Sequence, residues 1–260
     1  MSLTFDLVVP LYNEERNVAA LVGGIAECGL SQRGLQQVVL LDNGSTDGTL
    51  AVIQDLARTY SWIKVVHLAK NLNYGGGVYE GFRHTRAPFV GYVPGDNQVH
   101  ADDISRVWDR LREVQAALPS AERSKIFVKG RRTTRHDGFS TRLTSVIYTV
   151  AANVLLGLRA RDVNGLPKIF GRELLDRLPE ERMVTFTFDA QLLAVARAGL
   201  WTVEEVPVTF HARRAGVSSW SSKRLSTYKQ TAKQVWRLRS LRLASPKPLA
   251  LSGTKERQGV

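Results

Sequence analysis

Short apolar runs alternate with segments of helical periodicity along the first half of the chain. The predicted strands are Phe5–Val9, Gln37–Leu41, Ile63–Leu68, Phe89–Val93 and Ile126–Val128. The predicted helices between them are Glu15–Glu27, Thr49–Tyr60, Gly76–Thr85 and Asp102–Gln115. This order predicts an α/β fold with a mostly parallel sheet flanked by helices on both faces. Ligands of such sheets bind beyond the carboxyl ends of the strands, so the residues after each strand are the first candidates for a site.

The second half is less regular. Its predicted elements are helices at Phe139–Leu156, Leu174–Leu178 and Phe188–Arg197, and a strand at Thr202–Val208. From Trp220 to Leu243 the chain is basic and contains no acidic residue, and after Ser245 it becomes a loose tail. We therefore expect one α/β domain over residues 1–215, a basic loop or helix over 216–245 and a disordered tail over 246–260.

Composition excludes several classes of protein and leaves charge as the unusual property. The 260 residues are 43% apolar and 23% charged, which is typical of a globular protein and excludes disorder, collagen and a polytopic membrane protein. The chain has 36 Lys and Arg against 24 Asp and Glu, a net charge of +12. This charge favours polyanions such as nucleic acid, anionic lipid or phosphorylated substrates, without choosing among them.

Targeting features point to the cytoplasm. Cys28 is the single cysteine, which excludes an internal disulfide and a multi-cysteine zinc site. The N-terminus has no positive region before its apolar run, so it is typical of a first strand rather than a signal peptide. The longest uncharged stretch, Leu143–Leu158, contains Thr, Ser and Asn and is shorter than the roughly 20 apolar residues of a membrane span.

Polar segments follow the first two predicted strands. The segment PLYNEE would start a helix with Asn13 as its N-cap. The segment DNGSTDGT places Gly44 in a turn, with Ser45 or Asp47 capping the next helix. Capping does not explain why Asp42 stands at the exit of an apolar strand. A carboxylate there can accept hydrogen bonds from a nucleobase or from ribose hydroxyls.

The next two strands end in NLNYGGG and PGDNQVHADD. The three glycines allow close approach to a ligand, but Glu80 breaks the G-x-G-x-x-G pattern and no P-loop motif occurs. Asp96 and Gln98 are two residues apart, so in an extended turn both point the same way. Their oxygens suit a hard divalent cation, and the alternative is a polar turn before a helix capped by Asp102 or Asp103.

The ordered set VVPLYNEE, DNGSTDGT, NLNYGGG, PGDNQ, KGRR, FTFDAQLL and EVPV resembles the family-2 glycosyltransferases of GT-A fold. Within that family it is most similar to the dolichol- or polyprenyl-phosphate sugar synthases, over about residues 5–215. The resemblance implies an inverting transferase that uses a UDP- or GDP-linked sugar with Mg²⁺ or Mn²⁺. The residues implied in donor binding are Pro10, Tyr12, Glu14, Asp42, Asn73, Gly75, Asp96, Asn97 and Arg214.

The resemblance also implies metal ligands and marks two departures. Asp96 and Gln98 would hold the metal on the diphosphate, which makes Asp96 part of the catalytic machinery. The family usually has D-x-D-x-Q, and here Pro94 replaces the first acid, a common contact to the nucleoside. Relatives often carry D-x-x-[ST]-G on the acceptor side, where this chain has Asp162-Val163-Asn164-Gly165.

Asp189 matches the family's catalytic acid-base residue, which would take a proton from an acceptor hydroxyl. The alternative from the residues alone is an N-cap of the next helix. A phosphate acceptor is already ionised and needs no base, so with such an acceptor Asp189 would orient groups rather than move a proton. Arg132, Arg142 and Ser145 would bind that phosphate, because arginine offers a bidentate fork to phosphate oxygens.

Three functions follow. The first is transfer to a polyprenyl phosphate, with the chain lying peripherally on the cytoplasmic face of an anionic membrane through 143–158, Arg142, Arg159 and the basic C-terminal segment. The alternative for 143–158 is a core helix. The second function is transfer to a small-molecule or saccharide hydroxyl. The third is a basic module for nucleic acid or membrane without catalysis. We expect no nucleic-acid partner, because the strand-end carboxylates would repel phosphate unless a metal intervenes.

Overall fold

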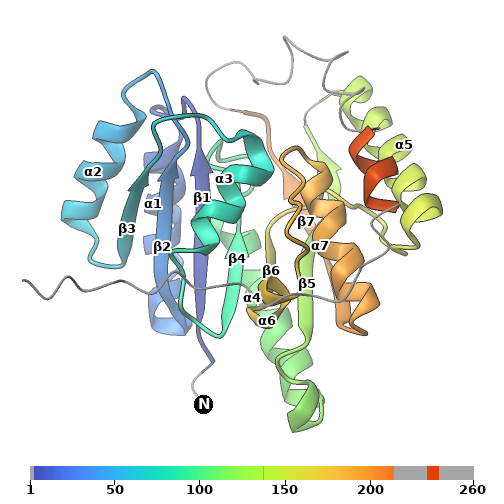
Figure 1. Ribbon diagram of the computed structural model, residues 1–260. Helices are drawn as coiled ribbons and strands as arrows, with labels where there is room; N and C mark the ends of the chain where they lie inside the picture. The colour runs from blue at the N-terminus through green and yellow to red at the C-terminus, as the bar shows by residue number, and fades with distance from the viewer. Residues whose placement is uncertain (1–2, 137, 214–232, 240–260) are drawn as a thin grey trace, which may run out of the picture.

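The computed structural model describes residues 3–136, 138–213 and 233–239 (Figure 1). A seven-stranded sheet with the order β3-β2-β1-β4-β6-β5-β7 forms its centre. The strands are β1 (Phe5–Leu11), β2 (Leu35–Asp42), β3 (Ile63–His67), β4 (Phe89–Tyr92), β5 (Ile126–Arg135), β6 (Lys168–Gly171) and β7 (Thr202–Phe210). Only β6 runs antiparallel to its neighbours β4 and β5, and all other pairs are parallel. The predicted mostly parallel α/β sheet is therefore confirmed.

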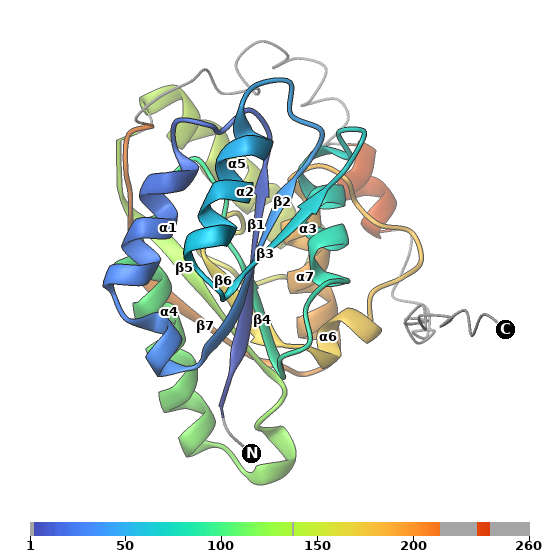
Figure 2. The same ribbon diagram turned by 90° about the vertical axis from the view of Figure 1, so that its left-hand side faces the viewer.

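Helices cover both faces of this sheet (Figure 2). They are α1 (Val18–Glu27), α2 (Thr49–Thr59), α3 (Asn73–Phe82), α4 (Ala101–Ala117), α5 (Phe139–Leu156), α6 (Glu173–Asp176) and α7 (Thr187–Ala198), with 3₁₀ turns η1 (Leu30–Arg33) and η2 (Ser120–Glu122). On one face α1 contacts α2 and α4, and on the other α7 contacts α3 and α6. Helix α5 lies apart from these layers, at the side of the molecule (Figure 1).

The apolar runs of the central strands explain why they are buried on both faces. Five consecutive residues of β1, from Phe5 to Val9, are buried, as are the last five of β2. Such unbroken burial is typical of strands between two helical layers. The edge strand β3 is less buried and carries Lys64 and His67 towards solvent, which discourages pairing with another chain. This buried core fixes the register of β1 and β2, and with it the positions at which these strands end.

Three elements differ from the sequence-based prediction. Strand β6 was not predicted, because its four residues include Lys168 and follow directly on Pro167. Strand β5 continues beyond Val128 to Arg135, because it pairs with β7 along this length. Helix α1 begins at Val18 after the N-cap residue Asn17, so the prediction of Asn13 as N-cap is wrong.

The C-terminal segment is described only in part. Residues 233–239 are helical, within the range 216–245 for which a basic loop or helix is expected. Val235 and Leu238 of this helix are buried, and Arg237 forms an ion pair of 2.5 Å with Glu181. The expected tail over 246–260 lies outside the described residues. No helix in the described part of the chain combines the length and the apolar character needed to cross a membrane.

Candidate active site

The loops at the carboxyl ends of β1, β2 and β3 are tied together by hydrogen bonds. The Asn13 N–H donates to Ser45 Oγ at 3.0 Å, and the Glu14 N–H donates to Thr49 Oγ1 at 2.9 Å. Asn43 donates through Nδ2 to the Asn73 carbonyl oxygen at 3.0 Å. These bonds are why the polar residues after separate strands form one continuous rim. The Asn13 side chain is not available to cap α1, because its Oδ1 accepts the Thr46 N–H at 2.8 Å.

Asp42 is buried at the exit of β2 and has a protein partner on each oxygen. Its Oδ1 accepts the Ser45 N–H at 2.9 Å, and its Oδ2 lies 2.7 Å from His67 Nδ1. Asp42 is 1% exposed, whereas His67 lies on the surface. These bonds orient the loop that follows β2. A role for Asp42 in binding the nucleoside stays a prediction.

Glu14, Asp96 and Arg213 form a charged group where β1, β4 and β7 end. Arg213 Nη2 donates to Glu14 Oε1, and Asn17 Nδ2 donates to Glu14 Oε2 at 2.7 Å. Burial raises the pKa of Glu14, with the charge of Arg213 opposing the shift and that of Asp96 adding to it. Burial also raises the pKa of Asp96, against the Gln98 N–H and Arg213. The buried Glu14 carboxylate and the half-buried Asp96 carboxylate thus share Arg213 among the described residues.

The predicted metal ligands lie in a turn rather than in an extended segment. Asn97, between Asp96 and Gln98, has φ of 55°, and the Gln98 N–H donates back to Asp96 Oδ1 at 3.2 Å. Gln98 Nε2 donates to the His211 carbonyl oxygen at 2.9 Å, which leaves its amide oxygen as the atom suited to a cation. Within the described ranges no three His, Cys, Asp or Glu side chains form a metal-binding group. A Mg²⁺-like ion with few protein ligands and several phosphate and water oxygens fits this donor set.

Three asparagines of the rim have left-handed backbone conformations. Asn13, Asn73 and Asn97 have φ of 57°, 62° and 55°. Asparagine tolerates this region better than most residues, and such conformations cluster at functional sites. Asn97 is buried, while Asn13 and Asn73 are exposed. All three lie in segments that the sequence placed beyond strand ends.

The remaining predicted donor residues have different surroundings. Tyr12 is exposed beyond β1, and Pro10 is half-buried within the strand. A Cβ atom at Gly75 would collide with the Met183 carbonyl oxygen, and the Gly75 N–H donates to the Val184 carbonyl oxygen at 2.9 Å. Packing against the segment before α7 is therefore enough to require glycine there. Arg214 lies outside the described residues.

Asp189 is fully buried in the first turn of α7, where three donors meet one of its oxygens. Lys168 Nζ of β6 donates to Oδ1 at 2.8 Å, the Tyr92 hydroxyl of β4 donates to the same atom, and the Tyr74 hydroxyl lies 3.4 Å away. Helix α7 begins at Thr187, so the alternative of Asp189 as N-cap is wrong. Burial, followed by the charge of Asp189, raises the pKa of both tyrosines well above the usual range.

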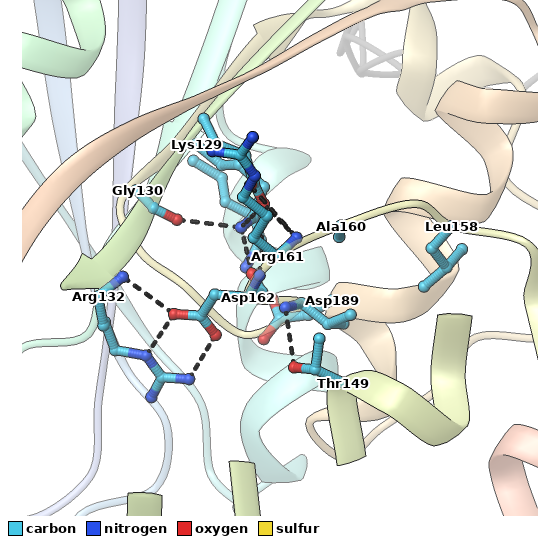
Figure 3. Close-up of polar contacts among 12 residues, drawn as sticks. Lys129, Gly130, Arg132, Thr149, Leu158, Ala160, Arg161, Asp162 and Asp189 are labelled. Atoms are coloured by element: carbon cyan, nitrogen blue, oxygen red, sulfur yellow. Dashed lines mark hydrogen bonds and ion pairs between the residues drawn. The ribbon is translucent and has the colours of Figure 1, made fainter. Parts of the chain in front are cut away.

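The predicted acceptor residue Arg132 is held by an aspartate (Figure 3). Its Nε and Nη2 donate to the two oxygens of Asp162 at 2.8 and 2.7 Å, and its backbone N–H donates at 3.0 Å. Burial alone would raise the pKa of Asp162, but the hydrogen bonds and charge of Arg132 outweigh it and hold that pKa well below the usual range. The other two predicted acceptor residues lie on α5, where Arg142 is exposed and Ser145 half-buried.

A second buried lysine supports the loop that contains Asp162. Lys129 of β5 is 0% exposed, and its Nζ donates to the Asp162 and Gly130 carbonyl oxygens and, at 3.2 Å, to Glu205 Oε1 (Figure 3). Burial lowers the pKa of Lys129, with Asp162 and Glu205 opposing the shift. Glu205 also accepts the Arg161 N–H at 3.1 Å. The loop is thus fixed from the sheet side.

Helix α5 is bound to the same loop by its polar face and turns an apolar face outward. Asn153 exchanges two hydrogen bonds with Ala160, of 2.7 and 3.0 Å, and Thr149 Oγ1 accepts the Val163 N–H at 3.3 Å. The outward residues, which we call the α5 stripe, are 49–78% exposed: Leu143, Val146, Ile147, Val150 and Val154. The alternative of a core helix is therefore wrong.

Several residues around Asp189 and Asp162 were not singled out from the sequence. They are Tyr74, Tyr92, Lys129, Lys168 and Glu205. The signal in the sequence was weak: a lysine within or beside an apolar run, as in IFVKG and PKIFG. Lysine is almost never fully buried unless it is paired, so such positions merit a search for a carboxylate partner.

Comparison with known proteins agrees with this architecture. The family described as glycosyl transferase family 2 matches residues 6–178. A dodecaprenyl-phosphate galacturonate synthase from Rhizobium johnstonii is 26% identical over 86% of this chain and 63% of its own length. A dolichyl-phosphate beta-glucosyltransferase from Trichomonas vaginalis is 23% identical over 79% of this chain and 65% of its own. The chain thus spans less than two thirds of the length of these curated relatives.

Solved structures share the fold. Glucosyl-3-phosphoglycerate synthase from Mycobacterium tuberculosis, crystallised with Mn²⁺, UDP and phosphoglyceric acid, aligns with a TM-score of 0.63. The identity is 21%, over 94% of this chain and 80% of the other. The same enzyme with Mg²⁺ and UDP aligns with a TM-score of 0.62. The expected GT-A fold is confirmed by this likeness, and the match over residues 6–178 shows that the chain belongs to glycosyl transferase family 2.

Proposed function

We propose that the protein transfers a sugar, with inversion, from a metal-bound UDP- or GDP-linked donor to a polyprenyl phosphate. The observation that carries this proposal is the charged group of Glu14, Asp96 and Arg213 where β1, β4 and β7 end. Asp96 is half-buried, burial raises its pKa, and its Oδ1 accepts the Gln98 N–H of the same turn. A carboxylate in this state gains from a cation, and a nucleotide diphosphate supplies the remaining oxygens.

The rim residues would hold the donor in the following way. Tyr12 is exposed at the carboxyl end of β1, where its ring can lie against a nucleobase. Asp42 keeps its loop in place next to the ribose position. A Mg²⁺ or Mn²⁺ ion at Asp96 and Gln98 would offset the charge that develops on the leaving diphosphate. Arg213 already reaches Glu14 across this rim and adds a positive charge beside the diphosphate.

The acceptor side follows from α5. A phosphate on an isoprenoid chain needs cations for its head and an apolar surface for its tail. Arg142 is exposed on α5, and the α5 stripe forms a continuous apolar face along the same helix. An amphipathic helix of this kind can lie in a membrane interface without crossing it, with arginines at the anionic head groups. The two relatives named for dodecaprenyl and dolichyl phosphate support this choice of acceptor.

Arg132 has a different role in this proposal. Its fork is occupied by Asp162, so it positions the acceptor loop and lends its charge at the rim of the phosphate site. Tyr148 of α5 is half-buried, and burial and then the charge of Asp189 raise its pKa. In this proposal, an acceptor held along α5 meets the donor next to Asp189.

Kinetics with vesicles that contain polyprenyl phosphate test the proposal. We expect metal-dependent transfer from a UDP- or GDP-sugar, identified first by a thermal-shift panel with and without Mn²⁺. At saturating donor, Asp189→Asn should keep kcat within about tenfold, because an ionised phosphate needs no base, whereas Arg132→Ala should abolish transfer. Transfer to a saccharide or small-molecule hydroxyl, with a loss of about 10²–10⁴-fold in Asp189→Asn, would contradict the phosphate acceptor.

A further inference from the structure

We propose that Lys168 and Tyr92 are positioning residues that fix Asp189 so that its Oδ2 atom accepts a hydrogen bond from a hydroxyl of the transferred sugar. Nothing in the family match or in the resemblance assigns a role to these two side chains. The inference rests on the proposed function, because it needs a nucleotide-sugar bound at the rim.

The geometry around Asp189 is strongly asymmetric. Lys168 Nζ at 2.8 Å, the Tyr92 hydroxyl and the Tyr74 hydroxyl at 3.4 Å all approach Oδ1. Oδ2 is buried and has no hydrogen-bond partner in the described part of the chain. Buried polar atoms are rarely left without a partner, so an unsatisfied carboxylate oxygen calls for a ligand donor. The donors on Oδ1 also prevent the carboxylate from rotating to satisfy Oδ2.

Tyr74 places this oxygen close to the donor site. Its hydroxyl lies 3.4 Å from Asp189 Oδ1, and the charge of Asp96 contributes to its raised pKa. Its ring stacks on Phe186 with centroids 4.8 Å apart. Tyr74 lies between Asn73 and Gly75, two residues implied in donor binding, so one aromatic side chain connects Asp189 to the segment proposed to hold the donor.

The chemistry of the two substrates selects the sugar as the partner of Oδ2. The phosphate of the acceptor presents anionic oxygens, which a carboxylate repels. The sugar ring presents hydroxyl groups, which donate hydrogen bonds, and a hydrogen bond to a charged acceptor discriminates strongly between ligands that have the donor and those that lack it. Lys168 and Tyr92 would therefore decide which sugar is accepted, although neither touches it.

Lys168 makes this arrangement sensitive to pH. Burial lowers the pKa of Lys168 to about 8, with the charge of Asp189 opposing the shift and that of Lys129 adding to it. The groups that face it are Asp189 from α7, Tyr92 from β4, Lys129 from β5 and Asp162 from the loop before β6. The ammonium is present below about pH 8 and is lost above it, and the anchor of Oδ1 is lost with it.

Titration calorimetry of wild type and variants with UDP and UDP-glucose, or GDP and GDP-mannose, in Mn²⁺ tests the inference. Tyr92→Phe removes one oxygen atom, and we expect it to weaken nucleotide-sugar binding about tenfold while nucleotide binding changes less than twofold. In wild type the preference for nucleotide-sugar over nucleotide should fall as the pH rises through about 8. Lys168→Arg should remove this fall, because arginine stays protonated, and Lys168→Met should show the reduced preference at every pH.

Two controls separate positioning from loss of structure. Lys129→Met removes an equally buried lysine that pairs with Glu205 rather than Asp189, so it should lower the melting temperature and keep the preference for the sugar. Tyr60→Phe removes a hydroxyl at the end of α2 and should change nothing. Equal effects of Tyr92→Phe on both ligands, or a preference that is independent of pH in wild type, would overturn the inference alone. No binding of either ligand to wild type would refute the proposed donor, and this inference with it.

Discussion

Two parts of this protein bring polar groups to the same end of the sheet by different means. We call them the donor half, around β1 to β4, which we propose binds the nucleotide, and the acceptor half, around β5 to β7, α5 and α7, which we propose holds the acceptor and Asp189. In the donor half, loops after β1, β2 and β3 are joined by hydrogen bonds between backbone and small side chains, as between Asn13 and Ser45. In the acceptor half, charged side chains are buried and paired: Lys129 with Glu205, Lys168 with Asp189, and Arg132 with Asp162.

This difference indicates how each half would bind its ligand. The donor rim leaves Asp96 short of partners, which suits a site that a charged ligand completes. The acceptor half pairs Lys129, Lys168 and Arg132 with carboxylates within the described part of the chain, because a buried charge without a partner costs several kcal/mol. What it presents outward is the apolar α5 stripe. The donor half thus leaves the Asp96 carboxylate available to a charged ligand. The acceptor half forms a fixed frame with an apolar surface.

Asp96→Asn should lower the rate of transfer strongly. Loss of the carboxylate weakens the grip on the metal, and we expect transfer to fall about 10³-fold. Initial rates with a labelled nucleotide-sugar across a range of Mn²⁺ concentrations measure this. Asp55→Asn, an exposed aspartate of α2, serves as the control. Full metal-dependent activity in Asp96→Asn would contradict the proposal that Asp96 holds the metal in the donor half.

The same chemical change should affect stability in opposite directions in the two halves. The pKa of Asp162 is lowered, so its charge contributes stability above the unfolded pKa of about 3.9, and Asp162→Asn should cost about 3 kcal/mol of unfolding free energy at pH 7. The pKa of Asp96 is raised, so Asp96→Asn should leave stability unchanged or higher at pH 7.

Urea titrations between pH 3 and pH 7 test both predicted changes in the free energy of unfolding. The penalty in Asp162→Asn should shrink as the pH falls below about 4, because the carboxyl of the unfolded wild type is then protonated while that of the folded state stays ionised. Any gain in Asp96→Asn should also disappear there. Equal destabilisation by both substitutions at pH 7 would show that the two halves do not differ in this way.

Ile147→Glu on the α5 stripe should weaken binding to anionic vesicles about tenfold, because burial of one large apolar side chain contributes about 1.5–3 kcal/mol. The side chain is 60% exposed, so the melting temperature should not change. Cosedimentation measures the partition. Leu200→Glu is the matched control, since Leu200 is 89% exposed and lies outside α5. An identical loss of vesicle binding in both variants would contradict the proposal that the α5 stripe contacts the membrane.

Tyr12→Leu should have the smallest effect. Stacking of a base on an aromatic ring contributes about 1 kcal/mol or more, so we expect the KM for the nucleotide-sugar to rise about fivefold with kcat unchanged. Tyr12→Phe keeps the ring and should behave as wild type. A fall in kcat without a change in KM would place Tyr12 elsewhere in the reaction.

Much of the donor half could be predicted from the sequence, and less of the acceptor half. The first four strands and the helices around them follow apolar periodicity, so Asp42 and Asp96 were placed correctly at strand ends. Strand β6 has four residues and a lysine in its apolar run, which hides its period. The start of α1 was misplaced because Asn13 bonds to Ser45 and Thr46, 32 and 33 residues away.

The sequence by itself determined the parallel sheet and the polar rim, because each depends on local pattern and on the rule that parallel strands end at one edge. Only the tertiary structure decided the partners of the buried charges. Lys168 meets Asp189 across 21 residues, Arg132 meets Asp162 across 30, and Tyr92 meets Asp189 across 97. Such pairs are set by the register of β6 against β4 and β5, which no single segment encodes. The outward face of α5 was decided in the same way, because only packing determines which side of an uncharged helix is covered.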